Sequence, residues 1–383
     1  MKKNKIILIS SAHFFTDIYS SFLEPILPLL MVKFGIGVFT ASVLSAALAI
    51  SRDMTQPVFG FLSDKLEKPL FIIAGLLFVG VFIPLLGIAP TYSIALVFVI
   101  LGGLGFAAFH PQGAAKVSVY SGKYRDKGMS YFIVSGRLGH AVGPGLVVVL
   151  ISLWGLSGLI PAVIPAVVIA VLMAKKIKPD NSTEINNIPI KNAFINAKRD
   201  MFILLFIATL RAFIILAFTM FIPMLIAKRG GSVSYYGTTL FLMHLAGTAG
   251  VYFGGGFLSE KIGAKMVLVI SFLLSIPFLY FYILLTGIQS VIIICIGDFI
   301  LCLSIPVAIT YAQKLVSSHI GTVTSLMMGF SWGIAGIFLI AAGAFAEKFG
   351  IQITLKLIAV FAFFGFIASV FLKGDKENHK KQS

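Results

Sequence analysis

Four polar side chains recur at helical spacing in the first apolar segment of the chain: His13, Asp17, Ser21 and Glu24. Intervals of four, four and three residues place them on one face of a helix. A carboxylate facing lipid is very costly, so this face is expected to line the interior of a helical bundle. Burial favours the uncharged form of a carboxyl group, which then exchanges protons near neutral pH. We predict proton exchange by Asp17, Glu24 and His13, with a gate role as the alternative for Glu24, which is nearer the outer end.

A structural ion pair is the competing interpretation of these carboxylates. Arg52 and Asp53 are adjacent in the second apolar segment, and neighbouring helical residues point about 100° apart. We therefore expect Arg52 to meet Asp17 or Glu24, either at a binding site or as a static buried pair that fixes helix packing.

A second cationic face lies in the fifth apolar segment, where Arg137 and His140 are three residues apart. The planar guanidinium group suits bidentate recognition of a carboxylate or phosphonate. Arg137 is thus the leading candidate for binding an anion, with His140 beside it. The alternative is that Arg137 only neutralises Asp17, Glu24 or Asp53.

The same segment contains Gly139-x-x-x-Gly143-Pro144. Small residues at this spacing permit close helix contact, and proline removes a backbone donor and can bend a helix. We predict that these three residues form a helix-packing motif.

Further candidates for a binding cavity are scattered along the chain. His110, before Pro111, is either a site residue or a structural histidine. The second half is poorer in charge, and its candidates are Arg211, His244, Phe218 and Phe241. For any single aromatic side chain, packing or lipid contact is the simpler interpretation.

The elements that must position these residues are membrane helices. Of the 383 residues, 58% are hydrophobic and only 11% are charged, and the mean hydropathy is +1.02. A soluble fold of this size could not bury so much apolar surface, so a soluble enzyme, a disordered chain and a fibrous protein are excluded. Twelve apolar runs have spanning length: 6–32, 38–62, 70–88, 91–115, 128–153, 155–174, 201–227, 236–258, 266–286, 289–312, 320–345 and 352–372.

The basic residues lie mostly on one side of this arrangement. The N-terminus, the even-numbered loops and the C-terminal tail hold 22 of the 30 Lys and Arg residues, against four on the opposite side. Such a bias predicts that both termini are cytoplasmic. Because no basic stripe is interleaved with aromatics, the net charge of +16 is not read as nucleic-acid binding.

The two halves of the chain repeat. GFLSDK at 60–65 recurs as GFLSEK at 256–261, and three other segments recur at offsets of 193 to 195 residues. We predict a six-helix bundle over 1–174, a cytoplasmic basic linker over 175–200, a second six-helix bundle over 201–372 and a cytoplasmic tail over 373–383. Two parallel repeats are typical of a protein in which one half rocks against the other around a central site.

The loop GFLSDKLEKPL at 60–70 resembles the motif between the second and third spans of the major facilitator superfamily. Gly60, Asp64, Lys65 and Lys68 match that motif, whereas Glu67 and Pro69 depart from it. Within the superfamily the chain resembles the fosmidomycin-resistance group of efflux transporters. The residues that carry this likeness are AHFFTDIYSSFLEPILPLL at 12–30, Gln56-Pro57, Phe109-His110-Pro111 and Tyr311-Ala-Gln313.

The resemblance implies an all-α membrane protein of twelve helices in two bundles, with the four matching loop residues as a cytoplasmic gate. It also implies proton-coupled efflux, by alternating access, of a small drug-like or anionic compound such as a phosphonate antibiotic. Gly139 to Pro144 resembles the antiporter motif of the superfamily. We expect small-molecule substrate, protons and lipid as partners, a functional monomer in the inner or plasma membrane, and neither a cofactor nor a resident metal.

Three alternatives stay open. Proton-coupled uptake of an organic anion fits the same residues. Divalent-metal transport is suggested by His13 and Asp17 on one turn, but no further clustered His or Cys is visible in the sequence. A membrane-embedded hydrolase would need a nucleophile–base pair, and none stands at convincing spacing.

Overall fold

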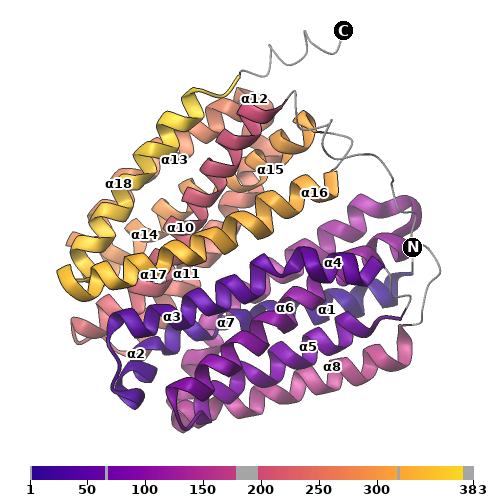
Figure 1. Cartoon of the computed structure of the whole chain (residues 1–383), viewed down its shortest axis with the longest axis horizontal. Helices are drawn as coiled ribbons and strands as arrows, with labels where there is room; N and C mark the ends of the chain where they lie inside the picture. The colour runs from indigo at the N-terminus through magenta and orange to yellow at the C-terminus, as the bar shows by residue number, and fades with distance from the viewer. Residues whose placement is uncertain (1, 65–67, 178–196, 317–319, 374–383) are drawn as a thin grey trace. The chain divides into compact units, whose positions relative to one another are not determined.

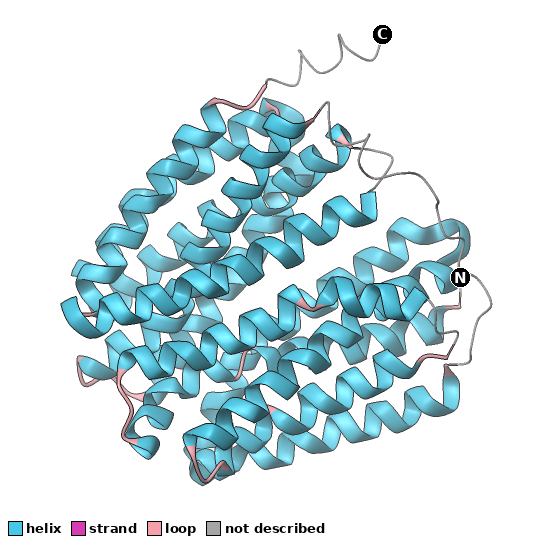
Figure 2. Ribbon diagram, in the orientation of Figure 1, coloured by secondary structure: helices cyan, strands magenta, loops and turns pink. Residues whose placement is uncertain are grey.

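The computed structural model describes residues 2–64, 68–177, 197–316 and 320–373, and every regular element among them is helical (Figure 2). The first half contains α1 (Lys3–Ser20), α2 (Leu23–Phe34), α3 (Val38–Ala49), α4 (Gln56–Asp64), α5 (Leu70–Phe82), α6 (Tyr92–Ser121), α7 (Arg125–Trp154) and α8 (Val163–Lys176). The second half contains α10 (Lys198–Lys228), α11 (Val233–Phe253), α12 (Ser259–Ile262), α13 (Ala264–Leu284), α14 (Gly287–Cys302), α15 (Ser304–Leu315), α16 (Ile320–Ser325), α17 (Ser331–Phe349) and α18 (Ile351–Val370).

These helices account for the twelve predicted spans. Nine stretches of the described residues are long and apolar enough to cross a bilayer, and one of them, Gly128–Lys176, is 49 residues long and suffices for two crossings. The predicted span 38–62 is divided at Thr55, and Val233–Phe253 carries His244 and several Gly, Thr and Tyr residues. With these two included, the twelve-helix arrangement is confirmed.

The first span is two helices and not one. Pro25 lacks the backbone N–H group that would bond the carbonyl of Ser21, whereas Pro28 lies within the next helix. The helix therefore ends at Ser20, and α2 begins at Leu23. The predicted common face holds for His13 and Asp17, but its extension to Glu24 is wrong, because Glu24 lies in the first turn of a new helix. A negative charge there is favoured by the helix dipole.

The second span contains a π-helical turn over Ile50–Met54 that joins α3 to the segment before α4. The hydroxyl of Ser51 donates to the carbonyl of Ala47 (2.6 Å), and that of Thr55 donates to the carbonyl of Ser51 (2.5 Å). Such turns are rare and change the direction of the side chains they contain. Here the turn carries Arg52 and Asp53.

By its contacts the chain divides into two compact units, residues 1–185 with 222–241 and residues 186–221 with 242–383. In the first unit α1 packs against both α7 and α6, and in the second α13 packs against α14 and α18 (Figure 1). The boundaries expected from the repeat, at 174 and 201, stay a prediction. Most of the predicted linker and nearly all of the predicted tail lie outside the described residues.

Candidate functional site

The centre of the first unit holds a compact group of three titratable side chains from α1 and α6. The Nε2 atoms of His13 and His110 lie 2.9 Å apart. The two carboxylate oxygens of Asp17 face one imidazole each, with Oδ1 at 3.3 Å from Nε2 of His110 and Oδ2 at 3.5 Å from Nε2 of His13. We call these three residues the His–Asp–His cluster. His13 and Asp17 meet because they are one turn apart, whereas His110 joins them only through packing of α6 on α1.

Both imidazoles are oriented by backbone carbonyls. Nδ1 of His13 lies 2.7 Å from the carbonyl oxygen of Phe132 on α7, and Nδ1 of His110 lies 2.9 Å from that of Phe106 on α6. The His13 ring stacks on Phe132 with centroids 3.9 Å apart, and the His110 ring stacks on Phe106 at 3.8 Å. In each histidine, one face of the ring is covered by a phenylalanine and Nδ1 is held by a carbonyl oxygen. Both Nε2 atoms therefore point into the cluster.

Glycines on α7 let this helix approach α1 closely enough to close the cluster. A side-chain carbon at Gly136 would collide with the His13 ring and the Asp17 carboxylate. At Gly139 it would collide with the carbonyl of Phe14, and at Gly143 with the hydroxyl of Ser21. The stripe from Gly136 to Gly143 is thus the surface on which α1 rests, as small-residue seams permit in membrane bundles.

The π-helical turn places a buried ion pair beside the cluster. Nη2 of Arg52 donates to Oδ2 of Asp53 at 2.8 Å, and Nε donates to both carboxylate oxygens at 3.1 Å. The guanidinium also lies over the Phe106 ring, 5.3 Å from its centroid. The π turn and the long arginine side chain thus bring the two adjacent groups together. Glu24 and Asp17 also act on the guanidinium electrostatically, and the expectation that Arg52 meets one of these two stays a prediction.

Arg137 and His140 lie on α7, both partly buried and both within electrostatic reach of the cluster. Among the described residues no carboxylate forms an ion pair with Arg137. Its guanidinium is therefore available to an anion. His140 places an imidazole on the same helix, three residues away.

The candidates of the second half lie on α10 and α11. Arg211 on α10 is fully buried and donates from Nη1 to the carbonyl of Ser304 at 3.2 Å. Phe218 is buried on α10 with its ring 6.4 Å from that of Tyr282. His244 is buried and Phe241 partly buried on α11. Arg211 thus bonds a backbone carbonyl and Phe218 packs on a tyrosine. The predicted substrate role of all four residues stays a prediction.

The predicted gate is partly described. Gly60 lies on α4, where a side-chain carbon would come 3.8 Å from Pro111. Lys68 is exposed, and its carbonyl accepts a bond from the amide nitrogen of Gln112 at 3.1 Å. The Gln112 oxygen accepts a bond from the backbone N–H of Ile72 at 3.0 Å, which fastens the start of α5 to α6. Lys65 and the side chain of Asp64 lie outside what the structure describes.

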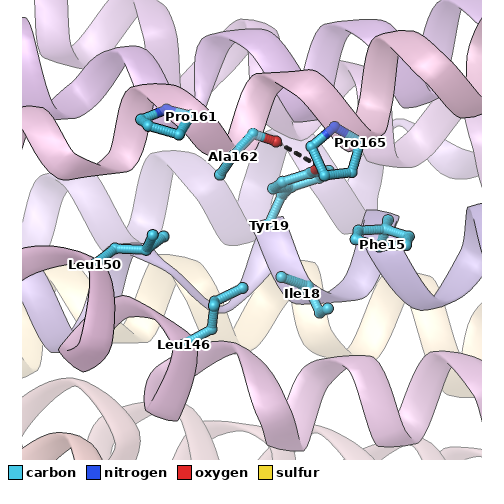
Figure 3. Close-up of a pocket in the computed structure, with 8 residues that line it drawn as sticks. All are labelled: Phe15, Ile18, Tyr19, Leu146, Leu150, Pro161, Ala162 and Pro165. Atoms are coloured by element: carbon cyan, nitrogen blue, oxygen red, sulfur yellow. Dashed lines mark hydrogen bonds between the residues drawn. The ribbon is translucent and has the colours of Figure 1, made fainter.

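A cavity of about 180 Å³ lies on another face of α1 (Figure 3). Tyr19 donates its hydroxyl proton to the carbonyl of Ala162 at 2.7 Å, so its polar end is occupied. The remaining lining residues are apolar: Phe15, Ile18, Leu146, Leu150, Pro161, Ala162 and Pro165. This cavity suits a hydrocarbon group and offers nothing to an anion.

The sequence analysis named His110 as a candidate site residue, but it did not place this histidine beside His13 and Asp17, and it missed the groups that orient the cluster. One donor atom from each of His13, Asp17 and His110 lies within 4.8 Å of the other two, close enough to surround one small cation. The further histidine that the sequence argument found lacking is supplied by α6. A signal for Phe132 does exist, since it stands four residues before Gly136, on the face of α7 that packs against α1.

Comparison with known proteins finds one family and two relatives that cover most of the chain. The family model described as Major Facilitator Superfamily matches residues 9–339 and 230–383. The fosmidomycin resistance protein of Escherichia coli K12 is 28% identical over 96% of this chain and 92% of its own length. The uncharacterized transporter YfnC of Bacillus subtilis 168 is 24% identical over 95% of this chain and 91% of its own.

Two solved structures share the fold. A bacterial homologue of the human lysosomal transporter Spinster, inward-facing and occupied, superposes with a TM-score of 0.81 at 13% identity, over 96% of both chains. The nucleoside transporter NupG superposes with a TM-score of 0.75 at 14% identity, over 96% of this chain and 99% of its own.

Proposed function

The chain belongs to the Major Facilitator Superfamily, and we propose that it is a proton-coupled exporter of a small anionic compound. It is a multi-pass membrane transporter and not an enzyme. The proposed part is the coupling ion, the direction and the class of substrate.

The observation that carries proton coupling is the position of Asp17. Its carboxylate is held inside the first unit against two imidazoles, and its Oδ1 atom is buried without a hydrogen bond. Ionisable groups within membrane helices are costly and mark ion pathways or proton relays. Histidine is the side chain that changes charge near physiological pH, so two imidazoles beside a buried carboxylate can take up and release a proton.

The anionic class of substrate is supported by Arg137. It lies on the helix that packs against the cluster, and no carboxylate of the described residues pairs with it. Arg52, by contrast, already faces Asp53. A substrate carboxylate or phosphonate would therefore find, next to the proton-exchanging group, a guanidinium that no carboxylate of the described residues pairs with.

Efflux is supported by the likeness to a fosmidomycin resistance protein. A transporter that confers resistance to a compound does so by exporting it, so the relative's name favours an outward direction for this chain. Uptake of an organic anion uses the same residues and is the second candidate.

Transport by the full-length protein in liposomes tests the proposal. An outward-directed and an inward-directed pH gradient are imposed in turn, with a phosphonate, a carboxylate of matched size and a neutral isostere as substrates. We expect a pH gradient to drive accumulation of the anionic compounds against their gradient, in the direction opposite to proton flow. Movement with the proton flow would identify uptake instead, and insensitivity to either gradient would refute coupling. Transport of Zn²⁺ or Co²⁺ in place of the anions would favour the divalent-metal alternative.

A further inference from the structure

The hydrogen-bond geometry of the His–Asp–His cluster determines which of its nitrogen atoms carry protons. A carbonyl oxygen only accepts hydrogen bonds, so the Nδ1 atoms of His13 and His110, at 2.7 and 2.9 Å from carbonyls, both carry a proton. A neutral imidazole has a single N–H. If both rings were neutral, both Nε2 atoms would be bare acceptors.

Two bare acceptors are incompatible with the observed contact. The Nε2 atoms lie 2.9 Å apart, a hydrogen-bond distance at which two lone pairs would repel. The Asp17 carboxylate beside them is a third acceptor. The contact therefore requires one additional proton between the two rings, and the pair then carries a single positive charge.

We propose that His13 and His110 share one exchangeable proton between their Nε2 atoms, and that this proton, balanced by Asp17, is the one exchanged for substrate. The second clause rests on the proposed function, and the first does not. The sequence predicted His110 as a substrate contact, and it is now assigned to the proton site. Asp17 acts as the counter-charge of the imidazolium in this state.

The distances favour a proton over a metal ion at this position. Two histidines bound to zinc at about 2.0–2.1 Å with a tetrahedral angle would hold their nitrogens about 3.3 Å apart. The observed 2.9 Å is shorter and suits an N–H···N bond. Each Asp17 oxygen also faces a different imidazole, as expected for a carboxylate that straddles a shared charge.

The surrounding charges come from every element packed on the cluster. Arg137 and His140 face it from α7, and the Arg52–Asp53 pair faces it from the π turn, with Glu24 within reach of Arg52. Arg52 is matched by Asp53, which leaves Arg137 as a cation that opposes the imidazolium.

Release of the proton changes how the helices fit. Without it the lone pairs of the two Nε2 atoms face each other and the cluster carries a net charge of −1, so the two rings must move apart. Because His13 lies on α1 and His110 on α6, the proton holds these helices together in the arrangement described here. Deprotonation is therefore expected to loosen α1 from α6.

Asparagine substitutions at His13 and His110 test the shared proton. His13→Asn and His110→Asn keep a side-chain N–H that can donate to the Phe132 or Phe106 carbonyl but remove Nε2. Each variant is measured in liposomes for pH-gradient-driven accumulation and for substrate exchange without a gradient. His379→Gln, in the C-terminal tail, is the matched control for loss of a histidine.

We expect each asparagine variant to lose gradient-driven accumulation by about tenfold or more while exchange persists, and the double variant to be no worse than either single one, because the pair acts as one unit. Proton release on substrate binding, followed with a pH indicator on purified protein, should fall from one proton to none.

Two outcomes would overturn the inference in different ways. If the wild type responds to the pH gradient and both asparagine variants do so equally, the shared proton is wrong while proton coupling stands. If the wild type does not respond, the proposed function itself fails. Zn²⁺ binding to the wild type that is lost in the variants, with no proton released on substrate binding, would assign the cluster to a metal.

Discussion

The guanidinium of Arg52 donates to both carboxylate oxygens of Asp53, the next residue in the chain, with the shortest of these bonds at 2.8 Å. Removing one partner of a buried pair leaves an uncompensated charge, which typically costs about 3–5 kcal/mol. Asp53→Asn is therefore expected to lower the thermal midpoint of the detergent-solubilised protein. The double variant Arg52→Gln with Asp53→Asn removes both charges and should recover part of the loss. Equal losses in the single and double variants would show that the pair is not energetically coupled.

Asp17→Asn should abolish proton-driven transport while leaving substrate exchange largely intact, because the proton shared by His13 and His110 loses its counter-charge. Gradient-driven accumulation in liposomes measures the effect. Glu347→Gln, which neutralises an exposed carboxylate on α17, serves as the control. Accumulation at the wild-type rate in Asp17→Asn would remove Asp17 from the coupling mechanism.

Gly136→Ala should impair both folding and transport. The added methyl group would meet the His13 ring and the Asp17 carboxylate, so α7 must move away from α1. Overpacking of this kind costs about 1–3 kcal/mol. Gly145→Ala lies on the same helix, and the nearest atom to its methyl would be at 3.7 Å, an ordinary contact. Thermal midpoints should therefore fall for the first variant and stay near wild type for the second. Similar values for both would contradict the role given to the glycine stripe.

Arg137→Ala should weaken binding of an anionic substrate far more than that of a neutral isostere. Arg137→Lys should restore part of the loss, because the charge returns but the bidentate fork does not. Binding of the matched pair of compounds to wild type and to both variants provides the measurement. If the two compounds lose affinity equally, or neither does, Arg137 is structural.

Gln112→Ala should loosen the start of α5. The side chain bridges the backbone N–H of Ile72 and the carbonyl of Lys68, and alanine leaves both groups without this partner. Hydrogen exchange over 68–74 should accelerate, with little change in α13 of the second unit. Gln313→Ala, whose amide donates to the hydroxyl of Thr324, is a matched amide control. Unchanged protection over 68–74 would show that the bridge does not hold the loop.

The sequence by itself determined the membrane class, the twelve spans and the pairing of His13 with Asp17. Hydropathy and helical period are local properties, so a bilayer-spanning helix and its i, i+4 neighbours follow from residues close in the chain. The likeness of the loop at 60–70 to a known family motif also needed only local residues.

Only the tertiary structure brought His110 to His13, because they are 97 positions apart in the sequence and meet through the packing of α6 on α1. Two local deviations from an ideal helix were equally decisive. Pro25 ends the first helix before Glu24, and the π turn at Ile50–Met54 directs Arg52 to Asp53. Side-chain partners depend on where a helix bends and what lies across from it, and helical spacing carries no information about either.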